Sequence, residues 1–175
     1  RRPVKLTARA LDAIDVAASG DTVVVTDGVY RVGGRAIPGY ALTNRVLISE
    51  SVTVRSVNGP ALTIIQGAGP LGPSAVRCVY ASAYAKLSGF TLTGGHTHVV
   101  GDNIYDLSGA GICSFANVLV SYCHITGNSA SNGGGGAYRG TLRQCVVRGN
   151  RARYGGGVDT STLTRTFVGS PGITY

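Results

Sequence analysis

The sequence predicts an all-β protein, a right-handed parallel β-helix of about six coils with roughly 22 residues in each. Two observations favour this fold: a composition suited to strands and turns, and short segments that recur along the chain. The 175 residues include 27 Gly, 21 Val and 16 Thr, but only two Lys, one Glu and no Met. β-Branched residues fit a pleated sheet, whereas residues that favour exposed helix are scarce here. An all-α bundle is therefore excluded.

The hydrophobic content excludes two further classes of protein. Hydrophobic residues make up 43% of the chain, which is enough to form a core, so intrinsic disorder is not expected. No apolar run approaches the roughly 20 residues that a membrane-spanning helix needs. The length suits one well-packed domain.

Four copies of a short segment carry the repeat. The last three follow one another at offsets of 22 and 21 residues, and the first precedes them by 33 because of an insertion. The copies are 87–95, 120–128, 142–150 and 163–170. Glycine clusters separate them, at 109–111, 133–136 and 155–157. Strand-sized segments joined by glycine turns at this period are typical of a solenoid.

Alternation within the copies predicts which side chains face the interior. We expect three inward columns, whose members lie about 4.8 Å apart on successive coils. The columns are positions 120/142/163, 123/145/166 and 125/147/168. The step of three between the first two columns requires a kink at Tyr122, Gln144 and Arg165. Asn128 and Asn150 occupy equivalent turn positions, where their side-chain amides are expected to pair.

Residues 1–20 are predicted to form an N-terminal segment with a short capping helix, and residues 21–175 the β-helix. Thr7 is expected to cap the helix and Gly20 to end it, with Leu11 and Ile14 on its apolar face. Further strands are expected at 21–25, 29–30, 46–48, 52–54 and 62–65, with loops at 38–43 and 67–74. The last repeat reaches Tyr175 without a capping helix. This predicts an uncapped C-terminal coil, belonging either to a longer solenoid or to subunits that stack end to end.

These segments resemble a known family. Residues 11–14, 20–25 and 27–30 are similar to the opening of right-handed parallel β-helices of the pectate-lyase-like superfamily. The later pattern Cys-x-Ile/Val-x-Gly-Asn with glycine clusters resembles the repeats of bacterial surface β-helices, such as polymorphic outer-membrane proteins and autotransporter passengers. The resemblance covers residues 11–170 and implies the fold. It does not imply one activity, because the same fold occurs in lyases, hydrolases, adhesins and purely structural proteins.

The acidic residues offer one candidate catalytic cluster. Lyases of this superfamily hold calcium in a carboxylate cluster, and its hydrolases use aspartates on adjacent coils. The eight acidic residues here include no such pair on adjacent coils beyond the N-terminal region. A loop at 94–106 nevertheless gathers His96, His98, Asp102 and Asp106, which suit proton transfer or a metal. The other interpretation is a solvated polar loop. We therefore predict no metal site and no cofactor, and calcium is expected only if the protein is a lyase.

The cysteines and the basic residues give the remaining candidates. Cys123 and Cys145 share an inward column and are expected to be free thiols rather than a disulfide. Cys78 and Cys113 are candidates for a second column. The net charge is +8, and an arginine-rich patch is expected to bind an anionic polysaccharide weakly, unless these residues serve only solubility. The patch comprises Arg143, Arg148, Arg151, Arg153, Tyr138 and Tyr154.

Taken together, these features favour a non-catalytic structural or adhesive β-helix module, extracellular or on the cell surface, that associates with itself end to end. The alternative is a pectate-lyase-like enzyme or binding domain that acts on acidic polysaccharide. Specific nucleic-acid binding is not expected, because no reading module is present.

Overall fold

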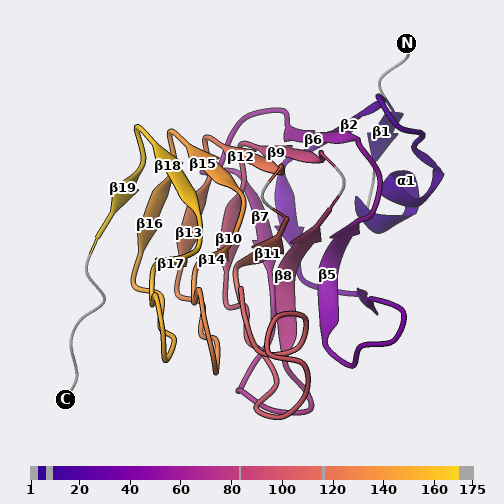
Figure 1. Cartoon of the computed structure of the whole chain (residues 1–175). Coiled ribbons are helices and arrows are strands. Elements are labelled where there is room, and N and C mark those ends of the chain that lie inside the picture. The colour runs from indigo at the N-terminus through magenta and orange to yellow at the C-terminus, as the bar shows by residue number, and fades with distance from the viewer. Residues whose placement is uncertain (1–3, 7–9, 83, 116, 170–175) are drawn as a thin grey trace.

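The chain winds into a parallel β-helix in which each coil contributes a strand to each of three sheets (Figure 1). The computed structural model describes residues 4–6, 10–82, 84–115 and 117–169. Within these residues, neighbouring strands are parallel except β4 and β5, which are antiparallel. The all-β parallel helix predicted from the repeats is therefore confirmed.

The three sheets form the sides of the solenoid. Sheet A runs in the order β1 (Val4–Leu6), β2 (Thr22–Val25), β6 (Thr53–Ser56), β9 (Lys86–Ser88), β12 (Leu119–Ser121), β15 (Thr141–Arg143) and β18 (Thr162–Thr164). Sheet B runs in the order β3 (Gly28–Tyr30), β7 (Thr63–Gln66), β10 (Thr91–Thr93), β13 (His124–Thr126), β16 (Val146–Arg148) and β19 (Phe167–Val168). Sheet C runs in the order β4 (Arg35–Ala36), β5 (Thr43–Ile48), β8 (Val76–Ala81), β11 (Ile112–Ser114), β14 (Ala137–Tyr138) and β17 (Val158–Asp159).

The coils differ in length. In sheet A, Val120 pairs with Leu142 and Leu142 with Leu163, which gives the 22- and 21-residue steps of the sequence repeat. Val54 pairs with Leu87 and Leu87 with Val120, two steps of 33 residues each. The earlier coils are longer because loops leave the solenoid between sheets B and C.

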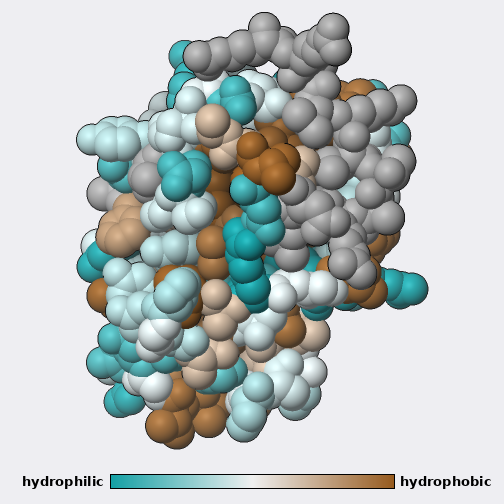
Figure 2. Space-filling view, turned by 90° about the vertical axis from the view of Figure 1, so that its right-hand side faces the viewer, coloured by the Kyte–Doolittle hydropathy of each residue, from teal (hydrophilic) through white to brown (hydrophobic). Residues whose placement is uncertain are grey.

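The predicted inward columns form the core. Val120, Leu142, Ile125 and Val147 have no exposed surface, and Cys123 and Cys145 lie beside them. Positions 163 and 168 belong to the last described coil, and Leu163 and Val168 are 43% and 37% exposed. Figure 2 views the N-terminal end, where hydrophobic residues appear among hydrophilic ones near the middle of the face.

The corner between sheets A and B confirms the predicted kink. Tyr122, Gln144 and Arg165 follow their sheet A strands directly and have φ values of 52°, 52° and 47°. This left-handed conformation costs about 1 kcal/mol for a residue other than glycine. It recurs in three successive coils because it turns the chain into sheet B with the next side chain inward.

A ladder of buried asparagines closes the corner after sheet B. The Nδ2 group of Asn128 donates to Oδ1 of Asn150 (2.9 Å) and to the Leu92 carbonyl (3.0 Å), and Asn150 repeats the second bond one coil later, with Ile125 (2.8 Å). The Oδ1 atom of Asn128 accepts from the Gly95 N–H (2.8 Å). The predicted amide pairing is therefore confirmed.

The glycine clusters make room for this ladder. A Cβ atom on Gly136 would lie 2.4 Å from the Gly157 carbonyl oxygen and 2.8 Å from Nδ2 of Asn150. A Cβ atom on Gly111 would make the equivalent contacts with Gly136 and Asn128, at 2.4 and 2.9 Å. Any side chain at these positions would push the coils apart, which explains why glycine and asparagine recur together.

The N-terminal end contains one element that the sequence did not predict. The helix α1 (Ala10–Val16) is present, with Ala13 and Ile14 buried against the core. Before it, β1 pairs with β2 and so extends sheet A beyond the first coil. The predicted cap Thr7 lies outside the described residues, and the side chain of Leu11 is not described.

We predict that Asn128→Ala lowers the free energy of unfolding by about 3 kcal/mol, because buried partners on the two neighbouring coils each lose a hydrogen bond. Denaturant titration measures the change. The control is Asn117→Ala on an exposed turn, for which a loss below about 0.5 kcal/mol is expected. Equal losses in the two variants would show that the asparagine ladder contributes no more to stability than an exposed turn residue does.

Candidate functional site

The predicted catalytic cluster lies in a loop that covers the outer face of sheet C. We call residues 96–109 the strap; it joins sheet B to sheet C and hangs below the solenoid in Figure 1. Ile104 and Tyr105 of the strap pack on the outward side chains Leu47, Tyr80 and Cys113 of sheet C. Burial in this second, smaller cluster raises the pKa of Tyr80 to about 12.

A fully buried arginine fixes the strap to the solenoid. The Arg77 guanidinium donates from Nε to the Gly109 carbonyl (3.0 Å) and from Nη2 to the Tyr105 and Ser108 carbonyls (2.7 Å each). Its Nη1 atom donates to Oδ1 of Asn44 (2.8 Å) on the neighbouring strand. Burial lowers the pKa of Arg77, but four well-placed acceptors compensate for the lost water. We did not identify this residue from the sequence.

Asp106 anchors the other side of the strap. It is buried, and its Oδ1 atom accepts from the Ala41 and Leu42 N–H groups (3.0 Å each), while Oδ2 accepts from the Asp102 N–H (3.0 Å). Burial acts to raise the pKa of Asp106, but these backbone bonds and nearby His98 outweigh it and hold the pKa below its usual value. Both carboxylate oxygens are thus occupied by the backbone.

Asp102 and His96 are also engaged in local structure. Oδ1 of Asp102 accepts from the Ile104 and Tyr105 N–H groups, at 2.8 and 2.9 Å. Nδ1 of His96 lies 3.1 Å from the Gly94 carbonyl. Among the residues that the structure describes, no group of three or more His, Cys, Asp and Glu side chains could hold a metal ion. The strap therefore brings the four residues onto one loop, but uses its carboxylates to shape that loop.

The cysteines are free and buried in the structure. Cys123 and Cys145 lie in the predicted column, and burial raises the pKa of Cys123. Cys78 lies inside the solenoid, where burial raises its pKa to about 12. Cys113 instead pairs with Tyr80 in sheet C and faces the strap, so the proposed Cys78–Cys113 column does not form.

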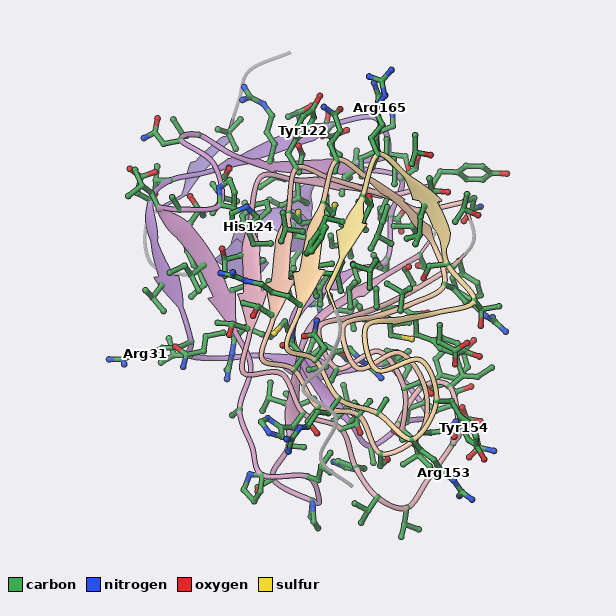
Figure 3. All side chains as sticks on the ribbon, turned by 90° about the vertical axis from the view of Figure 1, so that its left-hand side faces the viewer. Arg31, Tyr122, His124, Arg153, Tyr154 and Arg165 are labelled. Atoms are coloured by element: carbon green, nitrogen blue, oxygen red, sulfur yellow. The ribbon has the colours of Figure 1, made fainter. Side chains whose placement is uncertain are left out.

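The predicted arginine and tyrosine patch is divided among the sides of the solenoid. Arg143 lies on sheet A, Arg148 on sheet B and Tyr138 on sheet C. Arg153 lies over the ring of Tyr154, 5.3 Å from its centroid, in the connection after sheet B. Figure 3 shows this pair at a different side from His124, while Arg165 and Tyr122 mark the corner. The exposed Arg151 lies in the same connection.

A groove on the outer face of sheet B was missed from the sequence. It encloses about 420 Å³ and is lined by side chains of three adjacent strands: Thr91, His124, Thr126, Val146 and Arg148. The register sets Thr91, His124 and Val146 in one row, and Thr126 and Arg148 in the next. The repeat predicts that these positions face outward, but not that they enclose a hollow, because that depends on side-chain sizes across neighbouring coils.

Comparisons with known proteins give no relative. No protein-family model, curated protein or solved structure matches the chain. Among the described residues, the structure has no helix long and apolar enough to span a membrane.

We predict that Arg77→Met lowers the free energy of unfolding by about 3 kcal/mol or more, because four buried acceptors lose a charged donor. Limited proteolysis should also cut the strap faster in this variant. Arg55→Met, which removes an exposed arginine from sheet A, is the control and should change neither measurement. A strap that stays as protected as in the control would contradict the anchoring role of Arg77.

Proposed function

We propose that the protein is a non-catalytic structural or adhesive β-helix module that acts outside the cell or on its surface. The observation that carries this proposal is the engagement of the strap carboxylates: Asp102 and Asp106 accept backbone hydrogen bonds from their own loop and its neighbour. A general acid or base needs to reach a substrate proton, and Asp106 is buried with both oxygens occupied. The strap thus supports a scaffold rather than a reaction.

The resemblance of the repeats to bacterial surface β-helices supports the location. The cysteines suit it as well, because all four are buried in the structure and so shielded from oxidants and metals. Side chains on the outer faces of sheets A and B repeat at a regular interval along the solenoid axis, which suits contact with an extended partner.

End-to-end association is the self-assembly that this module would use. In the last described coil, β17, β18 and β19 each have one neighbour in their sheet, so their other edges are open among the described strands. The apolar residues Leu163, Phe167 and Val168 of this coil are 43%, 62% and 37% exposed. Open strand edges beside exposed apolar residues favour addition of a further coil, and we propose that a second copy supplies it.

We predict that the protein self-associates as its concentration rises and that Leu163→Lys weakens this association, because a charge would enter the shared apolar column. Sedimentation velocity over a wide range of concentration measures it. Leu62→Lys is the matched control, since Leu62 is 53% exposed but lies away from the open coil. A protein that stays monomeric throughout, or that responds equally to both variants, would contradict the end-to-end mode.

The alternative function is a pectate-lyase-like enzyme or binding domain for acidic polysaccharide. Its support is the exposure of all four arginines of the predicted patch, Arg143, Arg148, Arg151 and Arg153, in a chain of net charge +8. Because they are spread over several sides, they would hold a polyanion through the general field of the molecule rather than through one built site.

Product absorbance on polygalacturonate, with and without calcium, distinguishes the two functions. A non-catalytic module should release no unsaturated product in either condition. Its Asp102→Asn and His98→Ala variants should behave like the unchanged protein. Turnover that disappears in either variant would overturn the proposed function and place the reaction in the strap.

A further inference from the structure

We infer that the groove on sheet B is a binding site for a phosphate monoester group. Its walls combine a cation, an imidazole and a hydroxyl from two adjacent strands, namely Arg148, His124 and Thr126. Adjacent parallel strands are about 4.8 Å apart, so groups from β13 and β16 can reach one small ligand. The site is separate from the strap and borders the open coil only at Phe167, and it does not depend on the proposed adhesive role.

The charge of the surrounding surface favours an anion. The described outward side chains of the two rows through the groove include no Asp or Glu. One row contains Val29, Ile64, Thr91, His124, Val146 and Phe167, and the other Gln66, Thr93, Thr126 and Arg148. An anion in the groove would therefore meet the Arg148 cation without a competing carboxylate on this face.

The number of donors favours phosphate over carboxylate. A phosphate monoester presents three terminal oxygens and carries a charge near −2 at neutral pH, whereas a carboxylate has two oxygens and one charge. Three groups of the groove can donate hydrogen bonds to these oxygens: the Arg148 guanidinium, a ring N–H of His124 and the Thr126 hydroxyl. The Thr91 hydroxyl adds no donor, because its one proton already goes to the Pro60 carbonyl (2.7 Å).

The apolar part of the groove favours an ester over the free ion. Val146 lies between His124 and Phe167 in its row and is partly buried, whereas Phe167 is 62% exposed. An organic group attached to the phosphate would cover these two side chains, and burial of apolar surface adds affinity. Free phosphate offers no such contact.

Titrations followed by amide NMR shifts test the site with two probes: phenyl phosphate and inorganic phosphate. Phenyl phosphate should bind more tightly than inorganic phosphate, because its ring can cover Val146 and Phe167, with shifts centred on β10, β13 and β16. Arg148→Gln should weaken phenyl phosphate binding about tenfold or more, since a charged bidentate contact is lost. The control is Arg143→Gln, which removes an exposed arginine of the same coil on sheet A and should change affinity less than twofold.

Equal effects of Arg148→Gln and Arg143→Gln, or shifts away from sheet B, would overturn the site. Inorganic phosphate that binds as tightly as phenyl phosphate would overturn the assignment of the site to an ester. Each result can occur with or without self-association, so the two proposals fail separately.

Discussion

Stacking of equivalent positions governs this structure. In a parallel β-helix each side chain meets its counterpart about 4.8 Å away in the next coil. The size and polarity of a side chain must therefore either repeat along its column or be balanced by a neighbouring residue. Apolar residues satisfy this condition simply by packing. A buried amide satisfies it only when its N–H groups and its oxygen find partners on neighbouring coils. Asn128 donates to Leu92 on the preceding coil and to Asn150 on the next one, and Asn150 donates back to Ile125. Glycines at 111 and 136 follow from the same condition, because the ladder fills the space a side chain would need.

The strap shows what happens where the repeat is interrupted. The middle of the insertion has no counterpart in the next coil, so its polar backbone groups need partners other than the strand ladder. The ends of the strap still bond to the next coil, through Leu107 and Gly109. Arg77 and Asp106 replace that regularity with two charged anchors, one donating to strap carbonyls and the other accepting from N–H groups of the strap and a neighbouring loop. Residues that looked catalytic by type are thus required by the loop itself.

The difference between the repeated coils and the inserted strap also determines which features could be predicted from the sequence. The columns, the kink at Tyr122 and the asparagine pairing were predictable because each is a local pattern that the repeat multiplies. The buried Arg77 was not, because its acceptors come from Asn44 and from a loop 28 to 32 residues further along the chain. The division of Arg143 and Arg148 between two sheets follows from the corner at Gln144, but a patch judged by closeness in sequence overlooks that corner.

The outer faces are free of the constraint that fixes the interior, and specificity can arise only there. An outward position can change from His124 to Val146 to Phe167 without disturbing the columns, because these side chains contact neighbours on the face rather than a closed core. A hollow forms where small residues lie beside large ones on adjacent coils, as Thr126 does beside Arg148. The solenoid therefore supplies rigid spacing, and the differences between successive coils supply the chemistry.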